Sequence, residues 1–237
     1  PTHLFFFPAD PGTRDVERSR GLGDVYKRQG EKKALFNVLS TFAGGGGSST
    51  GYRLAGGKIL AINEFVEEAQ NTYRENYPNT TIIPGDIKKL TGTYLMEQAG
   101  VKVSELDILD GSPPCPPFSM SGTKQKGWGK EKMAYGWKQK NIEDLTFDQV
   151  RLVGELKPKV VVCENVKGLT MDYARGYLDM MLKAYEDQGY VMTHKVLNAW
   201  YHGVPQKRER VFIVGVRQDV ADVIGLNWMN ISRIYPE

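Results

Sequence analysis

The sequence predicts an α/β protein organised on one mostly parallel sheet with helices on both faces. Short apolar runs of strand length alternate along the chain with segments that repeat their apolar residues at helical spacing. A glycine-rich stretch follows the first apolar run, and acidic or proline-bounded residues follow several others. Open α/β sheets hold their binding and catalytic residues beyond the carboxyl ends of the strands. The same alternation therefore predicts the architecture and the edge at which the chemistry lies.

Seven apolar runs are expected to supply the strands, near residues 36–42, 58–63, 81–83, 106–109, 159–163, 190–197 and 211–216. Helical segments are expected around Tyr52 and Leu54, just after the glycine stretch, and at 67–77, 145–156 and 174–187. The second and third of these helices run up to a proline, which cannot continue a helix.

The bulk properties exclude several classes of protein. The chain has 237 residues, enough for one sizeable core or two small ones. Its two cysteines provide no disulfide framework and suggest a reducing compartment. No apolar run is long enough to span a bilayer and no signal-peptide pattern is present, so we expect no membrane partner. The net charge of +3 permits nucleic-acid binding without itself arguing for it.

Residues 1–30 do not fit this pattern. Their charged run has neither helical nor strand period, and residues 20–29 resemble translated adapter sequence of the kind found in metagenomic assemblies. We expect this segment to be foreign to the protein or disordered.

The glycine stretch contains Gly44, Gly46 and Gly47 and lies between a strand and a helix. Such a turn lets backbone approach a nucleotide-like ligand. The phosphate-binding lysine pattern is absent, because Tyr52 follows Gly51, and Ser49 stands where the dinucleotide fingerprint has its third glycine. A flexible linker is the alternative interpretation of the stretch.

Two acidic residues at strand ends extend this site. Glu64 ends the second strand and could accept hydrogen bonds from both hydroxyls of a ribose. Asp86 follows the third strand and could accept from an adenine amine, with Ile87 against the ring. Each acid alone is more often a solvated loop residue. Together with the glycine turn they outline an adenosine site without a pyrophosphate.

A stiff loop at 111–119 follows the strand at 106–109. It holds four prolines around Cys115, so it is neither helix nor central strand. A proline-rich turn with a buried thiol is the plain alternative.

The segment 120–141 that follows is rich in glycine and lysine and includes Lys124 and Lys126. Tryptophan and tyrosine interleave with the lysines, which suits phosphates and unstacked bases. A merely solvated loop is the alternative.

Three later features complete the set. Glu164 ends a fully apolar strand, where burial would raise the pKa of its carboxyl and let it hold a proton near neutral pH. Arg208 and Arg210 share one face of an extended segment, which directs two guanidiniums toward one site. Cys163 is expected to be a small core residue, and His202 a solvated loop residue.

These residues resemble the DNA cytosine-5 methyltransferases over about 35–217. Four segments carry the resemblance, in the family's order and with fitting spacings, each at a strand end. They are Thr41-Phe42-Ala43-Gly44 with Gly46-Gly47, then Pro113-Pro114-Cys115 with Phe118-Ser119, then Glu164-Asn165-Val166, and finally Gln206, Arg208 and Arg210.

The resemblance implies a Rossmann-like, S-adenosylmethionine-dependent methyltransferase fold, with a seven-stranded sheet that contains one antiparallel strand. It implies S-adenosylmethionine as cofactor and no metal. The implied cofactor-binding residues are Phe42, Ala43, Gly44, Gly46, Gly47, Glu64, Asp86, Ile87 and Pro113. The implied substrate-binding residues are Ser119, Lys124, Lys126 and Gln206, and the implied catalytic residues are Cys115, Glu164, Asn165, Arg208 and Arg210.

The resemblance also assigns roles. Cys115 attacks carbon 6 of cytosine as the thiolate, and protonated Glu164 donates to ring nitrogen 3. Asn165 holds the Glu164 loop. Arg210, or with less support Arg208, binds the 2-oxygen of a base flipped out of the duplex. The lysine-rich segment 120–141 is the candidate lid.

Three departures from the family pattern stand out. Ser40 replaces an acid that many members have before the cofactor loop, and Pro116 replaces the usual glutamine after the cysteine. Third, the chain stops about twenty residues after Arg217, before the family's target-recognition region and closing segment, so we expect a fragment. Residues 31–220 are expected to form the catalytic domain, and 221–237 a tail or the start of the missing target-recognition region.

The implied partners are double-stranded DNA and a cognate restriction endonuclease, for a monomeric cytoplasmic protein of bacterial or phage origin. Two alternatives stay open. One is methylation of cytosine in transfer RNA by the same fold, and the other is an inactive fragment that binds the cofactor. A nicotinamide dehydrogenase is disfavoured because the third glycine is missing.

Overall fold

A computed structural model describes residues 34–114, 132–134, 137–139 and 145–236. The predicted foreign or disordered segment at 1–30 lies outside these residues, as does most of the lysine-rich segment 120–141.

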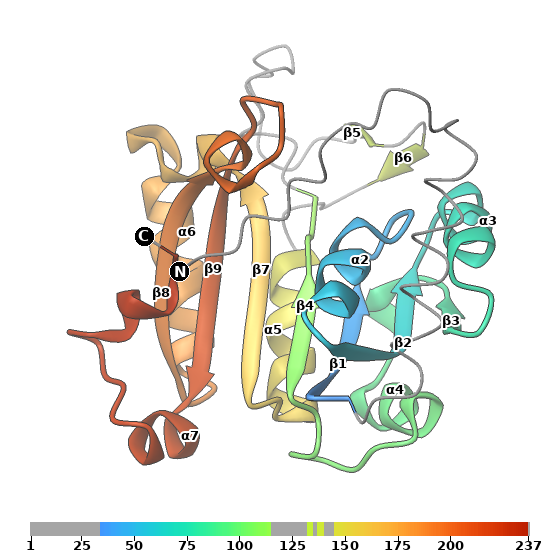
Figure 1. The fold of residues 1–237 in the computed structure, drawn as a ribbon, viewed down its shortest axis with the longest axis horizontal. Coiled ribbons are helices and arrows are strands. Elements are labelled where there is room, and N and C mark those ends of the chain that lie inside the picture. Colours follow the sequence, from blue (N-terminus) through green and yellow to red (C-terminus); the bar gives the residue numbers. More distant parts are fainter. Residues whose placement is uncertain (1–33, 115–131, 135–136, 140–144, 237) are drawn as a thin grey trace, which may run out of the picture.

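The core of the molecule is a seven-stranded sheet with the order β3-β2-β1-β4-β7-β9-β8 (Figure 1). The strands agree closely with the predicted runs, because each run is apolar enough to be buried. Their bounds are β1 Phe36–Thr41, β2 Gly57–Glu64, β3 Thr81–Pro84, β4 Ile108–Gly111, β7 Val160–Val166, β8 Tyr190–Asn198 and β9 Glu209–Arg217.

A single strand runs against the others. The pairs β1–β2, β1–β4, β2–β3 and β4–β7 are parallel, whereas β9 is antiparallel to both of its neighbours, β7 and β8. In Figure 1 the arrow of β7 points upward and that of β9 downward. The predicted sheet with one antiparallel strand is therefore confirmed.

The strand order changes direction between β1 and β4. From β1 the chain adds β2 and β3 on one side, and it then returns to place β4 on the other side of β1. The loops after β1 and β4 consequently leave the sheet in opposite directions and open a crevice between them, which is where open α/β sheets bind ligands.

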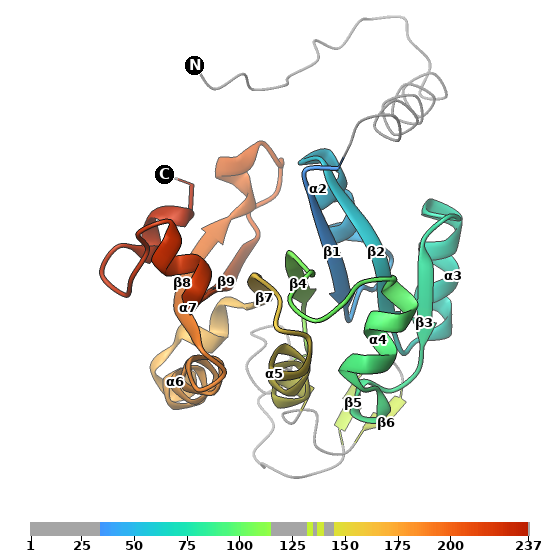
Figure 2. The ribbon, with the colours of Figure 1, turned by 90° about the horizontal axis from the view of Figure 1, so that it is seen from below.

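Helices cover both faces of the sheet (Figure 2). On one face, α2 (Gly47–Leu54) and α3 (Glu67–Asn76) pack around Tyr73, with Val38 and Ile62 of the sheet. On the other face, α4 (Gly92–Ala99) packs beside β2 and β3, α5 (Leu145–Leu156) packs against β1 and β4, and α6 (Asp172–Glu186) packs against β7 and β9. The sequence did not predict α4 or α7 (Gln218–Val223).

Helix α2 begins earlier than predicted. The whole glycine stretch to Gly51 was expected to be a turn, but the helix starts at Gly47. Serine and threonine are weak helix formers in isolation, because their hydroxyls compete for the hydrogen bonds of the helix backbone. Here the hydroxyls have other partners: Tyr73 donates to Ser49, and Thr50 donates to the carbonyl of Gly46. One tertiary and one local hydrogen bond therefore satisfy these hydroxyls where the helix extends into the glycine stretch.

Cys163 is fully buried among residues of α6 and β9, as predicted for a core cysteine. Within 120–141, where no regular structure was predicted, β5 (Lys132–Ala134) and β6 (Trp137–Gln139) form a short antiparallel pair. Among the described residues, no helix is long and apolar enough to cross a membrane.

Gly46 is the glycine of the stretch that the fold needs most. Its φ is +97°, and a Cβ there would lie 2.8 Å from the Tyr77 ring and 3.0 Å from the Tyr73 ring. We expect Gly46→Ala to lower the free energy of unfolding by about 2 kcal/mol or more, from left-handed strain and this clash. Chemical denaturation measures the change.

Gly47→Ala is the matched control for that experiment. Gly47 is the first residue of α2, and a Cβ there would meet nothing within 4 Å. We expect it to be neutral or to stabilise the protein by about 0.5 kcal/mol. Equal losses in the two variants would contradict the assignment of strain to Gly46.

Candidate active site

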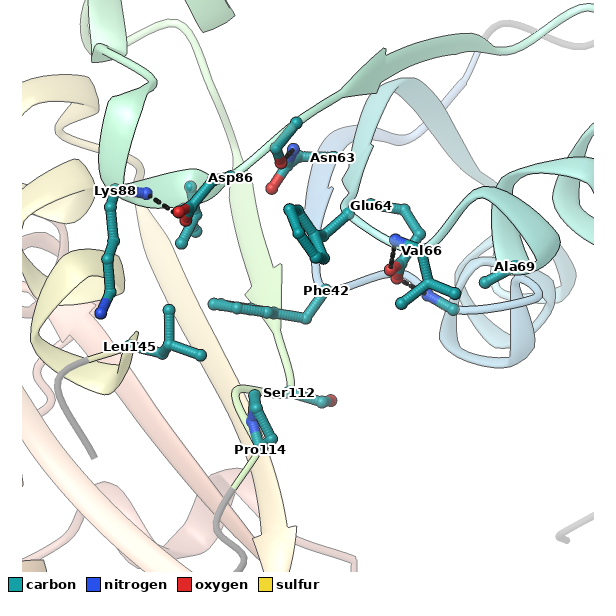
Figure 3. Close-up of a pocket in the computed structure, with 14 residues that line it drawn as sticks. Phe42, Asn63, Glu64, Val66, Ala69, Asp86, Lys88, Ser112, Pro114 and Leu145 are labelled. Carbon is teal, nitrogen blue, oxygen red and sulfur yellow. Dashed lines mark hydrogen bonds between the residues drawn. The ribbon is translucent and has the colours of Figure 1, made fainter. Parts of the chain in front are cut away.

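A cavity of about 380 Å³ opens at the crevice between β1 and β4 (Figure 3). Its walls come from the loops that follow β1, β2, β3 and β4 and from the start of α5. The lining residues are Phe42, Gly44, Asn63, Glu64, Phe65, Val66, Ala69, Gly85, Asp86, Ile87, Lys88, Ser112, Pro114 and Leu145. Predicted cofactor residues from three separate strand ends therefore line one cavity.

The turn after β1 forms one wall. Phe42 takes a left-handed φ of +53°, and Gly44 a φ of +54°, so the chain turns sharply as it leaves the strand. The Phe42 ring projects into the cavity (Figure 3). Of the other residues predicted to bind cofactor, Ala43 is buried in the core, Gly46 is the N-cap of α2 and Gly47 is exposed. These three support the turn and do not line the cavity.

Glu64 secures this turn from the next strand. Its side chain is 8% exposed, and its two oxygens accept from the backbone N–H of Gly44 at 2.7 Å and of Val66 at 2.8 Å. Its own carbonyl accepts from Gln70 of α3 at 2.9 Å. A carboxylate oxygen has two lone pairs, so each oxygen retains capacity for a ligand hydroxyl on its cavity side. The carboxylate is thus a structural clamp as well as a candidate ligand-binding group.

The opposite wall follows β3. Asn63 donates to the carbonyls of Ile83 at 3.0 Å and Gly85 at 3.1 Å, and so holds the chain that carries Asp86. The Asp86 side chain accepts from the Lys88 N–H at 3.1 Å, and Ile87 is buried in the cavity wall. This arrangement presents an acceptor beside an apolar surface.

The loop after β4 meets the same cavity. Ser112 and Pro114 line it, while Pro113 is buried beside them. Asn165, at the end of β7, donates to the Pro113 carbonyl at 3.2 Å and accepts from the Val166 N–H at 2.8 Å. This buried amide therefore joins the end of β7 to the start of the cysteine loop. Cys115, Ser119, Lys124 and Lys126 lie outside the described residues.

A second cavity, of about 370 Å³, lies beside Glu164, the residue that precedes Asn165. It is lined by Glu164, Leu197, Ala199, His202, Val204, Arg208, Arg210, Phe212 and Pro236. Both predicted arginines line it, whereas Gln206 is exposed beyond its lining. His202, expected to be a solvated loop residue, is exposed but also contributes to this wall.

Charge in the second cavity centres on Glu164. Arg210 Nε lies 3.1 Å from Glu164 Oε1, and both side chains are about one-quarter exposed. Burial raises the pKa of the Glu164 carboxyl, although the charges of Arg210 and Arg208 oppose the rise, and the charge of Asp110 adds to it. A carboxyl with a raised pKa beside two guanidiniums can hold a proton while the arginines bind an oxygen acceptor.

The sequence reasoning missed several lining residues. Phe65 is 49% exposed at the end of β2 and lines the first cavity, where its ring could face a planar ligand. Leu145 reaches the same cavity from α5. An exposed aromatic directly after a strand-end acid was a usable signal for Phe65. No local signal marked Leu145, because its position depends on how α5 packs.

Fold and cavities together define a class of protein: an open α/β protein with a ligand cavity at the point where the strand order reverses. Residues 36–233 match the family described as C-5 cytosine-specific DNA methylase. The chain belongs to that family.

Individual relatives support the same family membership. The chain is 36% identical over 197 residues to the Type II methyltransferase M.PspPI of a Psychrobacter species, covering 81% of this chain and 42% of the relative. It is 34% identical over 195 residues to the Type II methyltransferase M.Eco47II of Escherichia coli, covering 82% and 42%. The chain thus spans about two-fifths of the length of these relatives.

Solved structures give the same fold. A DNA modification methyltransferase encoded within an Escherichia coli prophage superposes with a TM-score of 0.64 at 25% identity, over 78% of this chain and 47% of that one. Spodoptera frugiperda DNMT2 superposes with a TM-score of 0.57 at 21% identity, over 78% and 50%. The second likeness supports the fold alone.

Glu64→Gln tests whether the two hydrogen bonds from Gly44 and Val66 to the Glu64 carboxylate stabilise the wall of the first cavity. In Glu64→Gln the new amide group faces one of the two backbone N–H groups and leaves it without an acceptor. We expect the free energy of unfolding to fall by about 1–3 kcal/mol, the cost of an unsatisfied buried donor. Chemical denaturation measures it. Glu67→Gln, the same change at an exposed position two residues beyond Phe65, should stay within about 0.5 kcal/mol of the parent.

Proposed function

We propose that this protein transfers a methyl group from S-adenosylmethionine to carbon 5 of cytosine in DNA. The observation that carries the proposal is the Asn165–Pro113 hydrogen bond. It couples the strand end that bears Glu164 to the loop that leads to Cys115, between a cofactor-sized cavity and a cavity lined by two arginines. Membership of the C-5 cytosine-specific DNA methylase family supports the same chemistry.

The first cavity fits S-adenosylmethionine in its chemistry. The Glu64 carboxylate would accept from the ribose hydroxyls, and Asp86 from the adenine amine. Phe42, Phe65 and Ile87 supply apolar surface for the ring. The turn at Gly44 brings backbone close to the ligand without side-chain bulk. When bound, the cofactor supplies an electrophilic methyl group.

The second cavity would receive the cytosine. The base must leave the duplex, because its reacting carbons are unreachable within the stack. Arg210 would bind the 2-oxygen, which requires it to exchange its present contact with Glu164 for the base. Loss of that contact removes a charge that lowers the pKa of Glu164, so the carboxyl would take up a proton from solvent and donate it to ring nitrogen 3.

The proposed reaction on cytosine proceeds by addition of Cys115, methyl transfer and elimination, and Glu164 recovers the proton that it donates. Cys115 as thiolate adds to carbon 6, and the Glu164 proton neutralises the charge that develops at ring nitrogen 3. Carbon 5 then carries the nucleophilic electron pair and takes the methyl group, while the electrons of the broken carbon–sulfur bond stay with sulfur and leave S-adenosylhomocysteine as a neutral thioether. Loss of the proton from carbon 5 to a base, which water can supply, expels the Cys115 thiolate and restores the aromatic ring, while ring nitrogen 3 returns its proton to Glu164.

The names of the relatives bear on the biological setting. The curated relatives are Type II methyltransferases, which supports DNA as the substrate and protection of that DNA from a cognate restriction endonuclease. The direct test incubates the full-length protein and tritiated S-adenosylmethionine with duplex DNA and, separately, with transfer RNA. Label in DNA alone supports the proposal, and label in RNA alone overturns the substrate.

Removal of the nucleophile tests the chemistry. We expect Cys115→Ala to abolish methyl transfer to DNA in the full-length protein, because no covalent adduct can form. Binding of S-adenosylmethionine, measured by calorimetry, should persist, since the predicted cofactor contacts remain. Cys163→Ala is the matched control, a buried core cysteine whose loss should spare turnover in folded protein. Turnover that survives in Cys115→Ala would remove that residue from the mechanism.

The pH dependence tests Glu164. Burial raises the pKa of its carboxyl, and the proposed role needs the protonated form. We therefore expect kcat/KM to fall as pH rises through that raised pKa, which gives the profile an alkaline limb. Glu164→Gln should lower the rate roughly a hundredfold, the low end for general acid catalysis, and remove the limb. The same alkaline limb in both proteins would assign it to another group.

A further inference from the structure

A buried carboxylate outside the proposed chemistry lies between the two halves of the site. Asp110 is the third residue of β4 and is 4% exposed. Its Oδ2 accepts from Ser40 Oγ and Ser48 Oγ, each at 2.8 Å, and its Oδ1 accepts from the Tyr52 hydroxyl at 3.1 Å. Burying a carboxylate is costly unless hydrogen bonds compensate, so three converging donors mark a site that the fold supports.

The donors all belong to the cofactor side of the crevice. Ser40 lies on β1 two residues before Phe42, and Ser48 and Tyr52 lie on α2, the helix that follows the glycine turn. Asp110 itself lies on the strand that leads through Ser112 into the cysteine loop. One side chain thus fastens the turn that contacts the cofactor to the strand that carries the nucleophile.

Asp110 also has a defined relation to Glu164. It pairs with Val162 of β7 in the parallel register, and Glu164 is two residues further along that strand. Paired residues of neighbouring strands share a face, and so do residues two apart on one strand. Asp110 and Glu164 therefore lie on the same face of adjacent strands.

Among the described residues, Asp110 and Glu164 have different kinds of neighbour. Asp110 faces the neutral donors Ser40, Ser48 and Tyr52. Burial raises the pKa of the Asp110 carboxyl, and the three hydrogen bonds oppose this rise. For Glu164 the interacting groups are Arg210 and Arg208, which lower the pKa of its carboxyl, and Asp110, which raises it. Donated hydrogen bonds favour the ionised form of Asp110.

We propose that Asp110 is a positioning residue that couples the two halves of the site: its carboxylate holds α2 and β1, with the glycine turn between them, against β4, and it lies on the same face of the sheet as Glu164 of the neighbouring strand. The proposal rests on the function proposed above. Asp110 would contact neither the cofactor nor the base. It would act by positioning α2 and through its effect on Glu164.

Asp110→Asn tests both parts, since it keeps the shape and removes the charge. We expect the KM for S-adenosylmethionine in the full-length protein to rise roughly tenfold, equivalent to about 1.4 kcal/mol. Without the carboxylate charge, the pKa of Glu164 falls, so the alkaline limb of kcat/KM should move to lower pH. A purely structural residue would lower the amount of active protein without moving that limb.

Asp107→Asn is the matched control. Asp107 just precedes the same strand and also bonds β1, accepting from the Asn37 N–H at 2.8 Å, and it pairs with Lys159 at 2.7 Å. It lies at the opposite end of the strands from the cavities. We expect this variant to lose stability but to keep the parental KM for S-adenosylmethionine and the parental alkaline limb.

Tyr52→Phe decides the matter if Asp110→Asn does not fold. It removes one donor and leaves the carboxylate charge and the ring in place, so we expect a KM increase of roughly threefold while the alkaline limb keeps its parental position. A parental KM in the folded variant, or an equal KM increase in Asp107→Asn, would overturn the proposal. Failure of the parent protein to bind S-adenosylmethionine would instead overturn the proposed function.

Discussion

The parallel pairing of β1 with β4 is the constraint on which the site depends. Its register aligns Thr41 with Gly111, so the glycine turn and the cysteine loop begin at the same level of the sheet. The change in strand order at this pair sends the two loops apart and opens the crevice between them. A shift in this register would separate the glycine turn from the cysteine loop.

Polar side chains hold that edge of the sheet together. Glu64 fixes the turn after β1, Asn165 fixes the start of the cysteine loop, and Asp110 joins β1 to β4 and α2. Each is at most 8% exposed, and each satisfies its hydrogen bonds across different elements. Buried polar networks of this kind specify one arrangement, because leaving any member unpaired is costly. The rigidity of the site therefore comes from the same residue types that carry its chemistry.

Much of the fold could be predicted from the sequence. Strand β7 begins with the continuous apolar run at 160–163, and helices such as Leu145–Leu156 repeat their apolar residues along one face. The start of α2 could not be predicted, since it depends on partners of Ser49 and Thr50 that include Tyr73, far along the chain. The strand-end acids and arginines of the site were recognisable, and an aromatic residue directly after a strand-end acid was an unused signal for Phe65. Leu145 and the role of Asp110 were not recognisable.

The sequence by itself determined the order of the elements and the chemical groups at each strand end, because periodicity and turn residues act locally. Tertiary structure alone decided which of those groups meet. Gly44, Asp86 and Pro114 line one cavity only because β1, β2, β3 and β4 are neighbours in the sheet. The hydrogen bond of Asn165 and the three donors of Asp110 likewise join residues far apart in the chain. Such long-range contacts leave no periodic trace in a single sequence, and the strand order that creates them is set by packing of the whole sheet.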